Sequence, residues 1–375
     1  MTSVAADAPA PASAAPPGTG RNRAMDVLKA FGILSVVLAH ATPPAIVVEV
    51  VQIYYIAVFF FVAGYFFKAE YFADFGALLR TRLLPLYGVF VAWNLSYLAY
   101  ETALVAPLLG LVGVDLGPAH ELSYAPRAAA AIILKGSPYS MGGALWFVTS
   151  LIAATVLFAA IGWLARRLPE RVSPHAVRLA VLACFFAGFG GETLLPWPAF
   201  GDTALVGLLV LYAGYRYRTF ETRVPLVPVV AVVCAAEVFV LRGTVDMTVD
   251  TYRDMLSFVV AVGAGIYALL WAASLLERSK VLNYIGRNTL FIAATHFVAF
   301  KVVALAHIAA RGLPLRELAR FPVIPDGNWW LAYFAGGVII PLALKATVID
   351  RWLISWRARP RPGRQTPYPA APAGP

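Results

Sequence analysis

Long apolar runs recur along the whole chain of 375 residues and are separated by short polar segments. A helix needs roughly 20 apolar residues to cross the hydrocarbon core of a bilayer. The runs therefore predict an all-α, polytopic membrane bundle of about ten transmembrane helices. The expected spans cover residues 27–43, 50–67, 84–106, 146–165, 177–194, 203–216, 224–241, 255–276, 288–307 and 330–348.

The composition excludes an ordinary soluble domain. Mean hydropathy is +0.74, 60% of the residues are hydrophobic and 13% are charged, whereas soluble domains carry roughly 25% charged residues. We assign residues 23–350 to one membrane domain. The stretch 1–22, rich in Ala, Pro and Ser, is predicted to be a disordered cytoplasmic tail, and the basic, Pro-rich stretch 351–375 a second cytoplasmic tail.

The distribution of positive charge predicts the orientation of the chain. The net charge is +10, and with the N-terminus inside the cell most Lys and Arg residues fall in segments on the cytoplasmic side, as the positive-inside rule requires. We therefore expect a multi-pass plasma membrane protein with both termini in the cytoplasm. The basic C-terminal tail is expected to attract anionic membrane lipid, and no nucleic acid partner is expected.

The first span carries three ionisable residues, Asp26, Lys29 and His40, on one helical stripe. Lys29 and His40 are about three turns, or about 16 Å, apart, and Asp26 lies within about 40° of the same line. Ionisable groups in a membrane helix are mostly paired or functional. His40 is therefore our candidate general base, since imidazole titrates near neutrality. The alternatives are a histidine that hydrogen-bonds a neighbouring helix and a lysine that reaches back to the headgroups; Asp26 is expected to orient Lys29.

Further polar or aromatic candidates stand at the starts of two later spans. Arg80 and Arg82 open the third span, where guanidinium groups can bind phosphate, although any positive-inside loop also supplies arginine. Trp146 begins the fourth span, where membership of an aromatic belt is the alternative role.

The ninth span brings a second imidazole, His296, into an apolar run. It follows Arg287 and Asn288, and one continuous helix would place Arg287 and His296 on nearly the same side. Glu101 is one of several acids in or near the spans, which are expected to relay protons or to pair with other polar groups.

Two long segments between spans and one aromatic run also bear on function. Residues 107–143 and 311–328 are expected outside, where they line a polar vestibule for a hydrophilic substrate or form ordinary solvated loops. The apolar piece 128–134 is too short to span and is expected to be interfacial or re-entrant. In the aromatic run 58–67, Gly64 would let a helix or an acyl chain approach closely, while a lipid-facing surface is the alternative. No Cys or His spacing suits a metal, so no metal site is expected.

Five sequence blocks occur in the order typical of one family of membrane enzymes. They are Asp26 to Lys29 followed by His40, Phe59 to Tyr65, Arg80 to Pro85, Leu145 to Val148, and Ile285 to Thr289 followed by His296. With these blocks the chain, over roughly residues 20–350, resembles the acyltransferase 3 family of integral membrane acyltransferases, in particular its fucose 4-O-acetylase-like branch.

The resemblance implies ten core helices and a sugar O-acetyltransferase. The donor would be acetyl-CoA, or another acyl-CoA, that enters from the cytoplasm, and the acceptor a hydroxyl of a carbohydrate or glycoconjugate at or across the membrane. No permanently bound cofactor is expected. Lys29 stands where many members have arginine, and one residue instead of the usual two separates Arg80 from Arg82. We assign catalysis to His40, Lys29, Asp26 and His296, and donor binding to Lys29, Arg80, Arg82, Arg287, Asn288 and Trp146.

Two rival functions use the same residues differently. A proton-coupled secondary transporter would employ the Lys, His and Glu side chains in the spans as relays or substrate ligands. A component of polysaccharide export would need neither His40 nor CoA. For the acyltransferase, direct transfer is the simpler hypothesis, because no Ser or Cys signature for an acyl-enzyme stands out.

Overall fold

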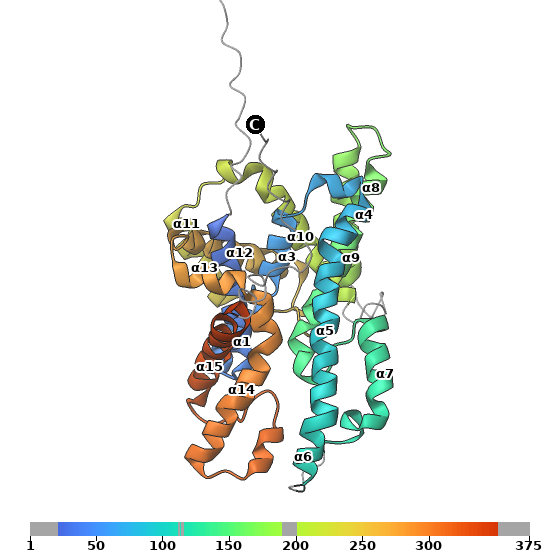
Figure 1. Cartoon of the computed structure of the whole chain (residues 1–375). Helices are drawn as coiled ribbons and strands as arrows, with labels where there is room; N and C mark the ends of the chain where they lie inside the picture. The colour runs from blue at the N-terminus through green and yellow to red at the C-terminus, as the bar shows by residue number, and fades with distance from the viewer. Residues whose placement is uncertain (1–21, 112, 114–115, 190–200, 352–375) are drawn as a thin grey trace, which may run out of the picture.

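The structure, a computed structural model, describes residues 22–111, 113, 116–189 and 201–351. Its regular elements are almost all helical (Figure 1), and the one sheet among these residues is the antiparallel pair β1 (Val245–Asp246) and β2 (Thr251–Tyr252). The α-helices are α1 (Arg23–His40), α2 (Ala45–Gln52), α3 (Ala57–Tyr65), α4 (Phe75–Leu78), α5 (Leu84–Tyr100), α6 (Ala106–Gly110), α7 (Ala125–Ala130), α8 (Trp146–Ala165), α9 (Ser173–Phe189), α10 (Gly201–Phe220), α11 (Pro228–Val240), α12 (Met255–Leu275), α13 (Lys280–Arg287), α14 (Thr289–Arg311) and α15 (Trp329–Leu344).

Short 3₁₀ and π-helical turns connect or interrupt these helices. The 3₁₀ turns are η1 (Ala69–Phe72), η4 (Pro118–His120), η5 (Leu122–Tyr124), η7 (Ser140–Leu145), η8 (Glu221–Arg223) and η9 (Leu315–Ala319). The π-helical turns are η2 (Leu79–Leu83), η3 (Glu101–Val105), η6 (Ala131–Lys135) and η10 (Lys345–Ile349).

The prediction of an all-α polytopic membrane protein is confirmed. Within the described ranges, six helical stretches are long and apolar enough to cross a membrane. Each predicted span overlaps at least one helix, although residues 190–194 of the fifth span lie outside the described part of the chain, as do most of the two predicted tails. The six stretches are Ala45–Tyr65, Phe75–Gly110, Leu122–Ala165, Met255–Leu275, Thr289–Arg311 and Trp329–Ile349.

Helix α1 ends abruptly at His40. Thr42 has φ 57°, in the left-handed region that a β-branched residue rarely adopts, and Pro43 and Pro44 follow before α2 begins. The turn therefore places His40 in the last helical position, beside the link to the second span.

The aromatic run is an internal packing surface and not a lipid-facing one. Phe59, Phe60 and Phe61 are buried, and α3 packs on α10 without room for side chains at the crossing. A Cβ on Gly64 would overlap the backbone of α10, and a Cβ on Gly214 would overlap the backbone of α3. Gly64 thus admits a neighbouring helix, which was one of its two expected roles.

The register of α1 against the C-terminal helices is fixed by glycines. A Cβ on Gly286 in α13 would overlap the Asp26 carbonyl group, whereas one on Gly337 in α15 would press on Val37. The chain passes from α13 directly into α14, so α14 continues beside α1 in the same direction. Helix α15 returns antiparallel to both. The helix is interrupted at Asn288 (φ −111°, ψ 17°), so the expectation that one continuous helix carries Arg287 and His296 is wrong.

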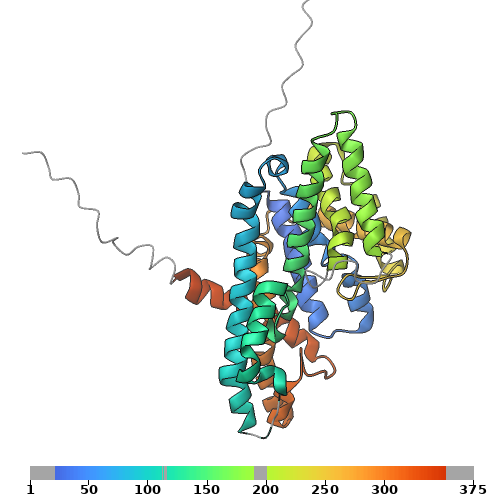
Figure 2. The ribbon, with the colours of Figure 1, turned by 90° about the vertical axis from the view of Figure 1, so that its right-hand side faces the viewer.

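The apolar piece 128–134 lies along α5 as part of α7 and η6 (Figures 1 and 2). The Tyr87 hydroxyl, near the start of α5, donates to the carbonyls of Ile132 and Ile133 at 3.3 and 2.8 Å. The segment therefore runs back beside a long helix. Figure 2 also shows α8 and α9, in green, as a hairpin that stands at the other end of the molecule.

Candidate active site

Two histidines from opposite ends of the sequence meet in the bundle. His40 Nδ1 lies 3.1 Å from His296 Nε2, and the two rings are nearly parallel, with centroids 5.2 Å apart and 18° between their planes. His296 is fully buried, whereas His40 is half-buried. The structure thus brings together both imidazoles that the sequence had indicated separately.

The hydrogen bonds of this pair fix which nitrogen of His40 is available. His296 Nδ1 lies 3.0 Å from the Ile292 carbonyl oxygen, which can only accept, so Nδ1 of His296 carries a proton. In the neutral pair, Nε2 of His296 then accepts from Nδ1–H of His40. Nε2 of His40 is left with its lone pair, as a general base requires. The bond to a neighbouring helix and the role of base are therefore compatible.

Two phenylalanine rings pack on the pair. The Phe297 ring centroid lies 4.9 Å from that of His40 and 4.2 Å from that of His296, and the Phe300 ring packs edge-on against His296, with centroids 5.5 Å apart. Apolar surroundings of this kind strengthen the hydrogen bonds of the pair.

Asp26 and Lys29 form an ion pair at the other end of α1. The Lys29 Nζ lies 2.8 Å from Asp26 Oδ1, and the Asp26 side chain is 4% exposed against 22% for Lys29. The carboxylate is thus placed to orient the ammonium group. The pair lies about three turns, or about 16 Å, from His40 along the helix, so the two groups do not act on the same atom.

Arg287 and Asn288 follow the glycine that packs on Asp26. The Arg287 Nε donates to the Asn283 carbonyl at 3.0 Å, and Asn288, which is buried, donates from Nδ2 to the Tyr284 carbonyl at 2.7 Å. In the part of the chain that the structure describes, the Tyr284 hydroxyl is the one buried side-chain polar atom with no hydrogen-bond partner. Sequence reasoning missed Tyr284, because only its missing partner distinguishes it from other aromatic residues.

Arg80 and Arg82 do not share a site. Arg82 is half-buried, and its Nη1 donates to the Ala63 carbonyl at 3.4 Å, whereas Arg80 is exposed and lies beside Gly76. One arginine therefore turns into the protein and the other away from it.

Arg82 lines an apolar pocket of about 420 Å³ between α5, α8 and the start of α14. Its walls include Pro85, Ile152 and Leu290, and we name it the apolar pocket. Leu290 precedes His296 by about 9 Å along α14. Trp146 is buried at the first position of α8, the helix that forms one wall.

A second, polar pocket of about 290 Å³ lies between α5 and the two long loops. Its charged and titratable members are Glu101, His120 and Lys301. Segments 107–143 and 311–328 both contribute walls, so they line a common pocket, as one of the two interpretations of these loops predicted. We name it the polar pocket; the sequence indicated Glu101 but missed Lys301, although a lysine inside an apolar run was a visible signal.

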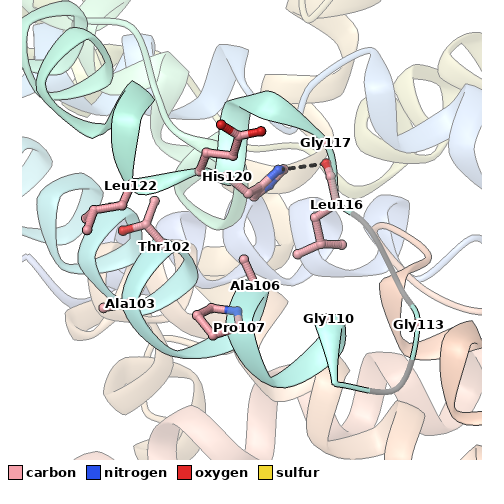
Figure 3. Close-up of a pocket in the computed structure, with 11 residues that line it drawn as sticks. Thr102, Ala103, Ala106, Pro107, Gly110, Gly113, Leu116, Gly117, His120 and Leu122 are labelled. Atoms are coloured by element: carbon pink, nitrogen blue, oxygen red, sulfur yellow. Dashed lines mark hydrogen bonds between the residues drawn. The ribbon is translucent and has the colours of Figure 1, made fainter.

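The side chain of His120 divides the polar pocket from a larger open one. Its Nε2 lies 3.2 Å from Glu101 Oε2, and its Nδ1 lies 3.0 Å from the Leu116 carbonyl oxygen, the bond drawn in Figure 3. The open pocket, about 740 Å³, is lined by Thr102 and Pro107 among others and shares His120 and Leu116 with the polar pocket. Among the described residues, no group of three or more His, Cys, Asp or Glu side chains could hold a metal ion.

The bundle and the site define a class: a multi-pass membrane protein in which a candidate general base is held between helices near two pockets. The family model of acyltransferase 3, described as an acyltransferase domain, matches residues 22–346. The chain therefore belongs to the acyltransferase 3 family and is a membrane acyltransferase. No curated protein and no solved structure matches it.

Proposed function

We propose that the protein is an O-acetyltransferase of the fucose 4-O-acetylase-like branch. It takes the acetyl group from cytoplasmic acetyl-CoA and transfers it to a hydroxyl of a carbohydrate or glycoconjugate, at or across the plasma membrane. The observation that carries the proposal is the histidine pair, in which the bond to His296 occupies Nδ1 of His40 and leaves Nε2 free to accept a proton.

The proposed reaction is a direct transfer. Nε2 of His40 accepts the proton of the acceptor hydroxyl while the hydroxyl oxygen attacks the thioester carbonyl carbon. The new C–O bond forms, the C–S bond of acetyl-CoA breaks, and the sulfur leaves with its electron pair. The proton then passes from His40 to the sulfur, so the products are the acetylated acceptor and free CoA thiol, and His40 is neutral again. His296 stabilises the positive charge of His40 between these steps, because its Nε2 accepts from Nδ1–H.

The donor site in this proposal begins at cationic groups and leads to the histidine pair. Arg82 would bind a phosphate of CoA at the apolar pocket, whose walls suit the pantetheine arm. Lys29, oriented by Asp26, and Arg287 would bind other phosphate groups. The unpartnered Tyr284 hydroxyl offers a hydrogen bond to the same ligand, since a buried polar group without a partner costs free energy until a ligand supplies one.

Asn288, Trp146 and Arg80 have smaller parts in the donor site. Asn288 is committed to the Tyr284 carbonyl and positions the segment that carries Arg287. Trp146 is buried at the start of α8, the helix that contributes Ile152 to the apolar pocket. The exposed Arg80 would act on the nucleotide only through long-range attraction. CoA is a substrate here, and no bound cofactor or metal is part of the proposal.

Purified protein in lipid nanodiscs tests the proposal. Acetyl-CoA is supplied with methyl pyranosides as probe acceptors, and the release of CoA thiol and the mass increase of one acetyl group are measured. Substitution H40A should lower kcat by about 10² to 10⁴, the usual contribution of a general base. The matched control is H175A, which removes an exposed histidine of α9. Full activity of H40A would show that the assigned base is wrong, and a stable acetylated protein formed from acetyl-CoA alone would contradict direct transfer.

A further inference from the structure

The polar pocket has unused hydrogen-bonding capacity at both of its charged groups. Glu101 is 4% exposed; its Oε1 accepts from the Met141 N–H at 3.2 Å, and its Oε2 faces His120. The Ser140 side chain also hydrogen-bonds this carboxylate. A carboxylate offers about four lone-pair positions, so about one remains. Lys301 Nζ donates to the carbonyls of Leu318 and Arg320, and an ammonium group has a third N–H.

Exposed aromatic rings complete the walls of this pocket. Tyr100 and Phe321 both line it and are 44% and 51% exposed. A buried acceptor, a cation with a spare donor and aromatic faces together suit a ring that carries several hydroxyls. A hydroxyl can donate to the carboxylate and accept from the ammonium group, while the C–H face of the ring packs on the aromatic side chains. A negatively charged ligand would meet Glu101, and a positively charged one would meet Lys301.

The polar pocket also adjoins the histidine pair. The Phe321 ring packs edge-on against Phe297, with centroids 4.7 Å apart, and Phe297 packs on His40 at 4.9 Å. One aromatic layer therefore separates the pocket from the proposed base. Ser140, another wall residue, has φ 31°, and backbone held in a sparsely populated conformation is concentrated at functional sites.

We infer that the polar pocket binds the acceptor as a neutral, hydroxyl-bearing ring, held between Glu101 and Lys301 and one aromatic layer away from His40. The inference rests on the proposed function, because it supplies a binding site for the acceptor next to the site of transfer. It goes further in assigning residues and charge preference: neutral pyranosides bind, whereas the corresponding amino sugars and uronic acids bind more weakly.

Cysteine protection tests this site with simple pyranosides as the probe ligands. Cys184 and Cys234, the two cysteines of the chain, are first replaced by alanine, and A319C is then introduced in the pocket wall. The protein in nanodiscs is treated with a small anionic methanethiosulfonate, with and without methyl α-D-glucopyranoside or its galacto and 6-deoxy counterparts. The control variant is L315C, on the same short helix, 46% exposed and outside the pocket lining.

A neutral pyranoside at about ten times its half-saturating concentration should slow the modification of A319C about tenfold, because the free fraction falls as 1/(1 + [L]/Kd). L315C should be unaffected. The E101Q substitution, added to A319C, keeps an acceptor oxygen for the Met141 N–H but removes the negative charge. It should raise the pyranoside concentration needed for half-maximal protection about tenfold to a hundredfold. K301M provides a second variant, and thermal unfolding checks that each variant is folded.

Each outcome separates the pocket from the proposed reaction. The assignment of the pocket is overturned if no pyranoside protects A319C. It is also overturned if pyranosides protect A319C as well after the E101Q or K301M substitution as before it. Equal protection by neutral, amino and acidic sugars overturns the charge preference. Acetyl transfer is measured in the same samples: transfer without protection leaves the proposed function standing and removes the pocket, whereas protection without transfer does the reverse.

Discussion

Replacing His296 by alanine tests whether the second histidine acts through the first. In the proposed reaction His40 is transiently protonated, and its Nδ1–H then makes a charge-assisted hydrogen bond to Nε2 of His296, 3.1 Å away in the resting pair. A hydrogen bond to a charged group contributes about 1.5 to 3 kcal/mol. At about 1.36 kcal/mol for each factor of ten, H296A should lower kcat about 10- to 150-fold.

The acetyl-CoA KM should change little in this variant, because His296 lies in α14 beyond the apolar pocket and touches His40, not the proposed phosphate ligands. The assay is CoA thiol release in nanodiscs at saturating acceptor, normalised to folded protein. H307A is the matched control: it removes another fully buried histidine from the same helix, one that binds Tyr333 and Asp326. It should lower thermal stability without lowering kcat per folded molecule.

The double variant H40A/H296A gives the sharpest outcome. If His296 works only by orienting and stabilising His40, removing it from H40A costs nothing more, because coupled residues are not additive. A double variant slower than H40A by the whole H296A factor would refute the pairing. So would full activity of H296A alone.

Three further substitutions test packing and the donor site. Adding a Cβ at Gly64 would force α3 off the α10 backbone, so G64A should lower the free energy of unfolding by about 1 to 3 kcal/mol or more. The control is G88A, where nothing lies within 4 Å of an added Cβ, and it should be neutral or stabilising. Equal effects of the two substitutions in thermal unfolding would contradict the close crossing. R82M should raise the acetyl-CoA KM about 10- to 100-fold, and R80M should raise it much less. A larger effect of R80M would show that the assignment of phosphate binding to Arg82 is wrong. Y284F should raise the thermal stability of the ligand-free protein by removing an unpartnered hydroxyl and weaken the stabilisation by acetyl-CoA; a lower melting temperature would indicate a partner for this hydroxyl.

The sequence alone was enough for the helical class and for the individual members of the histidine pair. Apolar runs near membrane length indicated the positions of the helices, and an imidazole in such a run is unusual enough to stand out. The pairing itself could not be predicted, because His40 and His296 are 256 positions apart. The alignment of α1 with α13 depends on Gly286 against the Asp26 backbone, and a glycine in a sequence does not reveal which helix it will meet.

Side-chain direction was the harder part of the site. The apolar pattern indicated one continuous third helix and one continuous ninth helix. A run of apolar residues looks much the same with or without a local irregularity of the helix. The pattern therefore revealed neither the π-helical turn at Leu79–Leu83 nor the break at Asn288. These irregularities decide where Arg82 and Arg287 point, so the sequence named the cationic residues without separating those that face the pocket from those that do not.

Two prolines provide a physical cause for the most consequential of these irregularities. Pro85 lacks an N–H, so the carbonyl four residues earlier loses its helical partner, and just before it the Leu84 N–H bonds to the Leu79 carbonyl across a π-helical turn. Pro107 stands in the same relation to the turn Glu101–Val105, where the Ala106 N–H bonds to the Glu101 carbonyl. A π turn inserts one residue and rotates what it carries relative to the rest of the helix, which is why such turns are frequent at functional sites. The first carries Arg82 to the apolar pocket and the second carries Glu101 to the polar pocket. One long stretch, Phe75–Gly110, therefore serves both pockets from its two ends, and it does so because a proline near each end lets the helix depart from α geometry where a polar side chain has to turn inward.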